Sequence, residues 1–186
     1  MKRLFDFSLA LILSILLLPI LLFLMLVVKL SSPGPAIYWS DRVGKNNVVF
    51  RMAKLRTMKI DTPAVATHLL ADPSSQLTPV GGFLRKSSLD ELPQLWNILV
   101  GDMSFVGPRP ALFNQADLIA LRTQAGVDRL SPGLTGWAQL NGRDELSINE
   151  KVKFDYDYLR HRNFLFDMKI IWLTAVQVAK AKGVSH

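Results

Sequence analysis

Two adjacent carboxylates, Asp90 and Glu91, are the residues of this chain best placed to do chemistry. Pro93 is comfortable only in the first turn of a helix, so we expect a helix to begin at Leu89 or Asp90. Both carboxylates would then lie beside free N–H groups at the positive end of the helix dipole, which favours their ionised forms. An ionised aspartate can bind a divalent cation or attack phosphorus. The spacing of Ser88 and Glu91 also fits a capping box, which is a purely structural role.

An arginine in a stiff segment is the second feature suited to chemistry. In Gly107-Pro108-Arg109-Pro110, the two prolines favour an extended backbone around Arg109. The planar guanidinium of arginine suits phosphate oxygens, and a rigid arginine loses little entropy on binding. The alternative is a surface turn that happens to contain an arginine.

Further basic residues surround these two features in the sequence. They are Lys54, Arg56, Arg85, Lys86 and Arg143. A diphosphate substrate requires such charge, and so does a surface that faces anionic lipid. The whole chain of 186 residues has a formal net charge of +7, which indicates an anionic partner. The sequence contains no cysteine, which excludes disulfides, thiol nucleophiles and cysteine-based zinc sites.

The N-terminal segment predicts a membrane helix. The run from Leu9 to Val28 is apolar except for Ser14 and Pro19. Twenty helical residues cover roughly 30 Å, which is about the hydrocarbon thickness of a bilayer. By length alone, a single transmembrane span is the simplest interpretation, and a cleaved signal peptide is disfavoured because the run is too long.

Two details favour a helix that enters only one leaflet. Pro19 removes a backbone hydrogen bond and kinks the helix in mid-run. Basic residues flank both ends, with Lys2 and Arg3 before the run and Lys29 after it. Positive residues tend to remain cytoplasmic, and a helix bent at Pro19 would keep both ends on one side. The residues alone leave both this re-entrant arrangement and a plain span open.

The rest of the chain predicts a mixed α/β (α+β) domain. Strands are expected at 36–40 and 48–52 as a hairpin, and a loop or short helix at 59–76. The other expected elements are helices over Leu89–Leu99, Ala111–Gln124, Ile148–Arg160 and Phe164–Lys182, and a strand at Trp137–Leu140. The last helix carries too many charges for a span. It fits an amphipathic helix lying in the membrane interface, or alternatively one that faces the core.

Several motifs in order give the chain a specific resemblance. Its sequence resembles the bacterial sugar transferase family of monotopic phosphoglycosyl transferases over nearly its whole length. The matching segments are Lys2–Asp6, Lys54–Met58, Ser88–Gln94, Gly101–Ser104, Val106–Pro110, Pro132–Gln139 and Asn141–Arg143, together with Asp155, Tyr158 and Asp167.

The resemblance implies a reaction and its residues. Asp90 matches the nucleophile, which attacks the sugar-proximal phosphate of a UDP-sugar, releases UMP and forms an aspartyl-phosphosugar intermediate. A polyprenyl phosphate such as undecaprenyl phosphate then takes the sugar phosphate. Glu91 matches the partner of Asp90, and Mg²⁺ is implied as the cofactor, with both carboxylates as candidate ligands. Arg85, Arg109 and Arg143 are candidate contacts for phosphate or nucleotide. Asp155 is a candidate substrate-site residue that supports the metal or one of these arginines, or else a helix-surface acid.

The resemblance also implies an architecture and a location. It favours a re-entrant membrane helix over residues 1–30 and a cytoplasmic catalytic domain over 31–186, at the bacterial inner membrane. Many relatives have serine directly before the membrane proline, whereas this chain has Leu18 there. Ser14, one turn earlier, joins Pro19 as the predicted helix-break pair.

Two other classes of protein would fit parts of this sequence. A membrane-tethered protein that binds anionic lipid or nucleic acid would account for the anchor and the charge. Nucleic acid is not expected as a partner, because the chain has no zinc spacing, helix-turn-helix signature or aromatic-rich strand motif. A pseudoenzyme is disfavoured because Asp90, Glu91 and Arg109 are all present.

Overall fold

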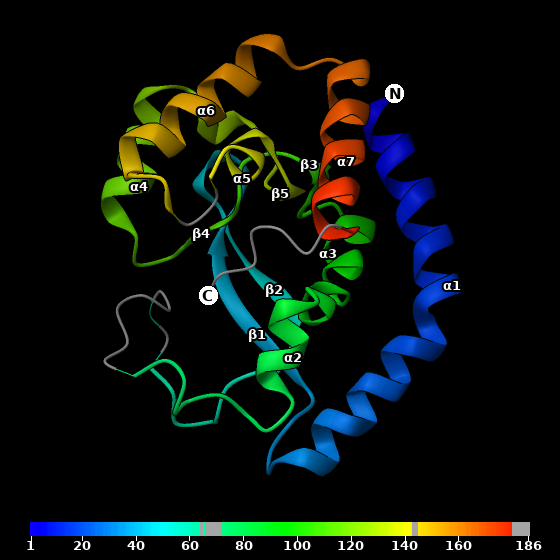
Figure 1. Ribbon diagram of the computed structural model, residues 1–186. Helices are drawn as coiled ribbons and strands as arrows, with labels where there is room; N and C mark the ends of the chain where they lie inside the picture. The colour runs from blue at the N-terminus through cyan, green and yellow to red at the C-terminus, as the bar shows by residue number, and fades with distance from the viewer. Residues whose placement is uncertain (64, 66–71, 143–144, 180–186) are drawn as a thin grey trace.

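The computed structural model describes residues 1–63, 65, 72–142 and 145–179 (Figure 1). Its helices are α1 (Lys2–Ser31), α2 (Gly81–Lys86), α3 (Gln94–Val100), α4 (Ala116–Gln124), α5 (Trp137–Leu140), α6 (Ile148–His161) and α7 (Phe164–Ala179), with short 3₁₀ helices η1 (Lys45–Asn47), η3 (Leu89–Glu91) and η4 (Val127–Arg129). Its strands are β1 (Ile37–Val43), β2 (Val49–Leu55), β3 (Ser104–Val106), β4 (Ala111–Leu112) and β5 (Gly133–Thr135). This arrangement confirms a mixed α/β chain with one long apolar N-terminal helix.

Two small sheets form the centre of the domain. The first has the order β2-β1-β4, with both pairs antiparallel, and the second joins β3 and β5 in parallel. The predicted hairpin is confirmed: Ile37 pairs with Leu55 and Val43 with Val49. Its turn places Asn46 and Asn47 in the left-handed region, which asparagine tolerates better than most residues.

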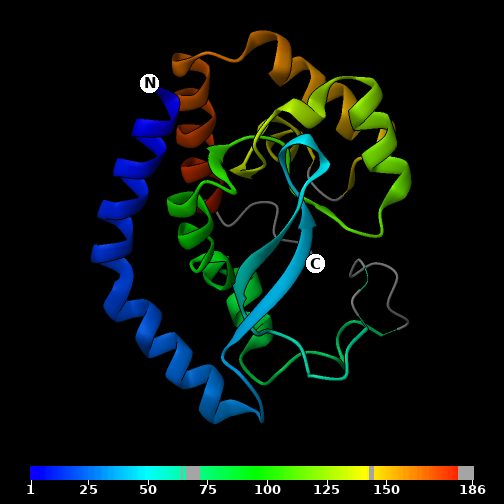
Figure 2. The same cartoon turned by 180° about the vertical axis from the view of Figure 1, so that it is seen from behind.

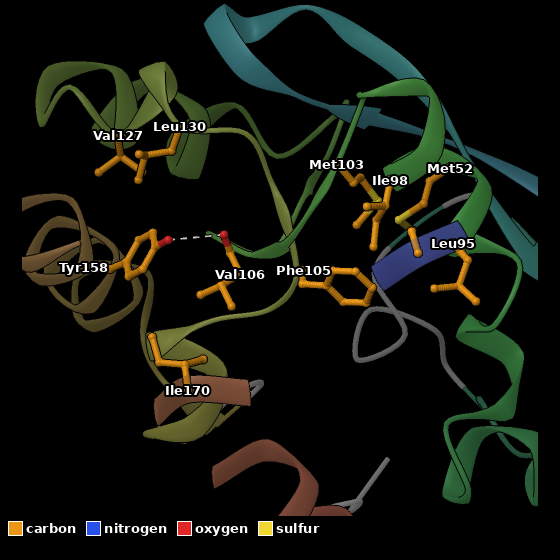
Figure 3. Packing of buried hydrophobic residues seen from close by; sticks show 11 residues of the cluster. Met52, Leu95, Ile98, Met103, Phe105, Val106, Val127, Leu130, Tyr158 and Ile170 are labelled. Carbon is orange, nitrogen blue, oxygen red and sulfur yellow. Dashed lines mark hydrogen bonds between the residues drawn. The ribbon is translucent and has the colours of Figure 1, made fainter. Parts of the chain in front are cut away.

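The core joins these sheets to the helices around them. Figure 3 shows Met52 of β2 and Ile98 of α3 on one side, and Tyr158 of α6 and Ile170 of α7 on the other, with Val106 of β3 between them. The Tyr158 hydroxyl lies 3.3 Å from the carbonyl of Val106, and all three residues of β3 are buried. Strand β3 therefore fixes the position of the loop that follows it.

Helix α1 lies along the outside of the domain, next to α7 and α3 (Figures 1 and 2). Near its start, Lys2 forms an ion pair with Asp167 at 2.6 Å, and buried Asp6 accepts a hydrogen bond from the Ser104 hydroxyl at 2.8 Å. Near its end, Val28 is fully buried in a cluster with Leu55 and other apolar side chains. Both ends of α1 therefore contact the same globular domain.

The outward face of α1 remains apolar and exposed. Its exposed side chains include Leu4, Phe7, Leu11, Ile15, Leu16, Phe23 and Leu26. Among the described residues, α1 is the one helix long and apolar enough to cross a membrane. The helix is continuous from Lys2 to Ser31 with Pro19 inside it, and Figures 1 and 2 show it bending part-way along. The predicted re-entrant path, and the division of the chain at residue 30, remain predictions.

Three sequence predictions are changed by the structure. Residues 137–140 form helix α5 and not a strand, because the strand that pairs with β3 lies earlier, at Gly133–Thr135. The helix expected from Ala111 begins at Ala116, because Ala111 and Leu112 pair with β1. The helix expected over 89–99 is divided into η3 and α3 at Pro93. The predicted helix from Ile148 is confirmed. So is the one from Phe164 as far as Ala179, with its predicted end outside the described residues.

Candidate active site

The acidic pair lies on a single turn of 3₁₀ helix. Ser88, which precedes it, has a positive φ of 56° and makes no side-chain cap, so the capping box does not form. Pro93 occupies the N-cap position of α3, where its missing N–H costs no hydrogen bond. Asp90 is buried and Glu91 is half-buried. These two carboxylates are therefore held by the backbone turn between α2 and α3.

Lys54 joins both carboxylates from the neighbouring strand β2. Its Nζ lies 2.9 Å from Glu91 Oε1 and 3.7 Å from Asp90 Oδ2. The Lys54 side chain is itself only 15% exposed, so these charges interact with little screening by water. The sequence indicated Lys54 only as one basic residue among several. Its register on β2, opposite η3, is what makes it part of the site.

Two arginines complete the cationic surroundings of the pair. Arg109 Nη1 lies 3.5 Å from Glu91 Oε1, so the structure brings together Asp90, Glu91 and Arg109 as a group. Arg85 of α2 donates from Nε to the Thr57 hydroxyl at 3.0 Å, and its charge acts on Asp90. Arg143, the third predicted arginine, lies outside the described residues.

Burial changes the titration of this group. The pKa of Asp90 is raised above its ordinary value of 3.8, chiefly because burial disfavours the charged form. The charge of Lys54 acts in the opposite direction and lowers this pKa, while Glu91 raises it further. Burial also lowers the pKa of Arg85. Desolvation thus has more effect on the pKa of Asp90 than the helix tip expected from the sequence. The neighbouring cations lower this pKa and so act against the desolvation.

Asp155 lies behind Arg109 and contacts it through another residue. Asp155 is almost fully buried on α6 and accepts hydrogen bonds from Nε and Nη2 of Arg122, at 2.9 and 2.6 Å. The Nη1 of Arg122 donates to the carbonyl of Arg109 at 2.8 Å. Asp155 therefore pairs with Arg122 of α4, which was not among the predicted site residues. Nothing in the sequence pattern linked the two.

Close backbone contacts fix the strand that leads to Arg109. A Cβ on Gly133 would lie 2.1 Å from the backbone nitrogen of Gly107, and one on Gly136 would lie 2.1 Å from the carbonyl oxygen of Gly107. Only glycine allows such an approach. Strand β3 and the segment around β5 therefore pack backbone against backbone, and the Gly107–Pro110 turn emerges from a rigid base.

The donor atoms suit a hard divalent cation that also binds a phosphorylated substrate. No cluster of three or more acidic, histidine or cysteine side chains that could hold a metal occurs among the described residues. Asp90 and Glu91 supply carboxylate oxygens from consecutive residues. Mg²⁺ is commonly bound by one or two carboxylates together with substrate phosphates, so this pair fits that ion.

Arg56, another of the basic residues noted in the sequence, has a different position. It is buried and donates from Nε to the carbonyl of Pro35 at 2.7 Å and from Nη2 to that of Ser32 at 2.9 Å. Its charge is used to hold the segment that follows α1 against β2. A basic residue next to the site in sequence is therefore a structural tether.

The chain matches one known protein family over nearly its whole length. The family model described as bacterial sugar transferase matches residues 1–181. The chain belongs to this family. The resemblance seen in its motifs is thereby confirmed over nearly the whole sequence.

Individual relatives give the same family. The chain is 42% identical over 182 residues to the UDP-glucose:undecaprenyl-phosphate glucose-1-phosphate transferase of Escherichia coli, which covers 94% of this chain and 39% of that protein. It is 39% identical to an uncharacterized sugar transferase, EpsL, of Bacillus subtilis, over 100% of this chain and 91% of the relative. It is 35% identical to the undecaprenyl-phosphate galactose phosphotransferase of Salmonella typhimurium, over 98% and 41% respectively. The chain thus spans about two fifths of the first and third of these relatives.

Proposed function

We propose that this bacterial sugar transferase moves a sugar phosphate from a UDP-sugar to a polyprenyl phosphate such as undecaprenyl phosphate, giving a polyprenyl-diphosphate sugar and UMP. The observation that carries the proposal is the buried Asp90 with Lys54 and Glu91 beside it, together with Arg109, which lies 3.5 Å from Glu91. Relatives named for sugar-phosphate transfer to undecaprenyl phosphate support the same substrates.

The reaction proceeds in two displacements. In the first, a carboxylate oxygen of Asp90 forms a bond to the sugar-proximal phosphorus of the UDP-sugar. The bond from that phosphorus to the bridging oxygen breaks, and UMP leaves with the electron pair. In the second, an oxygen of the polyprenyl phosphate attacks the same phosphorus and releases the Asp90 carboxylate. Donor and acceptor are both anions, so a covalent carrier lets them react in separate steps.

Each neighbouring side chain has a role in this scheme. Lys54 favours the ionised form of Asp90 against the effect of burial, which a nucleophile requires. Arg109 and Arg85 provide positive charge for the phosphates, in surroundings where it is weakly screened. Asp90 and Glu91 would hold Mg²⁺, which supplies charge neutralisation at the diphosphate when it is bound.

The membrane arrangement belongs to the same proposal. Helix α1 enters the cytoplasmic leaflet of the bacterial inner membrane and returns, so that the domain faces the cytoplasm where nucleotide sugars are made. Its contacts at both ends with one domain, and its exposed apolar outer face, support this path. The exposed Leu165, Trp172 and Val178 of α7 fit the interface beside it.

Release of UMP tests the proposal directly. The full chain in lipid nanodiscs would be incubated with Mg²⁺, undecaprenyl phosphate and each of a panel of UDP-sugars. We expect release with at least one donor, lost on adding EDTA and in Asp90→Asn. Formation of a sugar-phosphate adduct on Asp90, detected by mass spectrometry in the absence of acceptor, would identify the intermediate. Folded protein that releases no UMP from any donor would contradict the proposal and favour a tethered lipid-binding protein.

A further inference from the structure

A hollow lies at the end of the molecule where α1 begins. Its volume is about 410 Å³, and residues from the start of α1, the hairpin turn, η4 and the α6–α7 junction line it. Figures 1 and 2 show the N-terminus beside the α6–α7 junction, with α2 toward the other end. None of Lys54, Arg85, Asp90, Glu91 and Arg109 lines this hollow. It is therefore separate from the candidate active site.

Positive charge dominates this hollow. Four cationic side chains line it, namely Lys2, Lys45, Arg129 and Arg162, against the single carboxylate of Asp167. That carboxylate is already engaged, since it accepts from the Tyr158 hydroxyl and from Lys2, each at 2.6 Å.

Within the described part of the chain, the other three cations, Lys45, Arg129 and Arg162, form no ion pair. Like charges around one concave surface repel each other and focus a positive potential, which an anion relieves. The hollow is also within the usual size range of ligand sites. An anionic group of lipid-headgroup size would fit its volume and its charge.

Apolar side chains continue from the rim of the hollow. Phe164 lines it and stacks edge-on against Phe5 of α1, with ring centroids 5.3 Å apart. Leu4 and Leu165, the chain neighbours of these two rings, are 70% and 78% exposed. A soluble anion would gain nothing from such a rim. A molecule with an anionic head and hydrocarbon chains would contact both parts.

We propose that this hollow binds the phosphate group of an anionic membrane phospholipid, with its acyl chains along the exposed apolar side chains of α1 and α7. The bound lipid holds the beginning of α1 at the depth of the headgroups. It acts as a membrane contact that is distinct from the substrates of the transfer reaction.

Native mass spectrometry of the delipidated full chain in detergent micelles tests this inference. The protein would be titrated separately with phosphatidylglycerol, phosphatidylcholine, undecaprenyl phosphate and inorganic phosphate. The test variant is Lys45→Gln/Arg129→Gln/Arg162→Gln. The control variant is Lys59→Gln/Lys153→Gln/Arg160→Gln, which removes the same charge from residues that do not line the hollow.

We expect phosphatidylglycerol to bind more tightly than phosphatidylcholine. The test variant should weaken phosphatidylglycerol binding by roughly a hundredfold, since each cation near a lipid phosphate contributes about fivefold. The control variant should bind like the parent chain. Equal losses in both variants would mean that net charge alone attracts the lipid, and would overturn the assignment.

The other ligands distinguish the sources of phosphate. Displacement of phosphatidylglycerol by inorganic phosphate would show a simple anion site and contradict a lipid. Loss of undecaprenyl phosphate binding in the test variant, with phosphatidylglycerol binding unchanged, would make the hollow an acceptor site and also overturn the proposal. Phosphatidylglycerol binding needs no turnover, and Asp90→Asn should retain it, so this test is independent of the proposed transferase activity.

Discussion

Arg122 of α4 reaches Asp155 of α6 with two nitrogens, Nε and Nη2, on a single carboxylate oxygen. The pair is buried, with side-chain exposures of 11% and 2%, and the remaining Nη1 holds the carbonyl of Arg109. The pKa of Asp155 is raised above its ordinary value, chiefly by burial, and the charge and hydrogen bond of Arg122 act in the opposite direction. The pair thus fixes the backbone of the arginine that lies against Glu91, without contacting the acidic pair itself.

Breaking this pair should reduce both stability and turnover. Arg122→Leu leaves a buried, unpaired carboxylate, and such a change costs about 3–5 kcal/mol of unfolding free energy. Arg122→Lys keeps the charge but cannot donate to Asp155 and to the Arg109 carbonyl in the same geometry, so we expect kcat for UMP release to fall about tenfold with a smaller loss of stability.

The matched control for this pair is Asp157→Asn on the same helix α6, which removes a carboxylate two residues from Asp155. It should retain both turnover and melting temperature. A turnover in Arg122→Lys equal to that of the parent chain would show that Arg109 is positioned without this pair.

Asp90→Asn should separate activity from stability. It removes the proposed nucleophile, so UMP release should fall by a factor of at least about 10³. It also removes a buried charge whose pKa is raised by desolvation, so the melting temperature should rise by roughly a few degrees. Glu91→Gln should reduce turnover without this stabilisation, because Glu91 is the closer partner of Lys54. A lower melting temperature for Asp90→Asn would contradict the inference that the buried, ionised Asp90 side chain destabilises the folded protein.

The pH dependence follows from the raised pKa of Asp90. A raised folded-state value means that the contribution of this group to stability is fully present below 3.8 and is lost as pH rises through the folded pKa. The ionised form of Asp90, which the proposed reaction requires as nucleophile, increases over the same interval. Activity should therefore rise with pH where this part of the stability falls, which parallel pH profiles of kcat/KM and of melting temperature would measure.

Lys54→Met should move the acid limb of that activity profile upward. The charge of Lys54 lowers the pKa of Asp90, so removing it should shift the limb to higher pH. Lys59→Met, an exposed lysine beyond the end of β2, removes the same charge and should leave the limb in place. An unchanged limb in Lys54→Met would assign the titration to a different group.

Glycine substitutions test the close backbone packing that supports the segment containing Arg109. Gly133→Ala places a methyl group 2.1 Å from the Gly107 nitrogen, where no flexible side chain can give way, so we expect a loss of several kcal/mol or failure to fold. Gly82→Ala in α2 meets only Leu77 at 3.8 Å and should stabilise the protein by about 0.5–1 kcal/mol. Chemical denaturation would measure both changes, and an equal effect of the two would contradict the packing described here.

The sequence predicted correctly those elements whose structure depends mainly on neighbouring residues in the chain. The hairpin, helix α6 and the apolar α1 each carry their own signal of alternation, capping or length. The acidic pair and Arg109 were expected as separate features, and both lie at the site. The family resemblance placed the acidic pair and Arg109 in one site. Lys54 joins that site because of the position of β2 next to η3, which cannot be read from one segment of the sequence.

The remaining features depend on contacts between distant segments. Trp137–Leu140 reads as a strand by composition, but Gly133–Thr135 already pairs with β3 and leaves the next residues free to form a helix. The partner of Asp155 is Arg122, which is separated from it by 33 residues. The pKa of Asp90 likewise reflects burial beneath other elements, which a helix-dipole argument from sequence does not include.

The ion pair between Lys2 and Asp167 joins residues 165 positions apart, so α1 and α7 can be joined there only after α7 has been synthesised. At about 5–20 residues per second, a ribosome needs roughly ten to thirty seconds to supply Asp167 after Lys2. During that time α1 can already pack against α3 and β2, which are synthesised before α7. The contact between α1 and α7 is therefore among the last that the described part of the chain can form during synthesis.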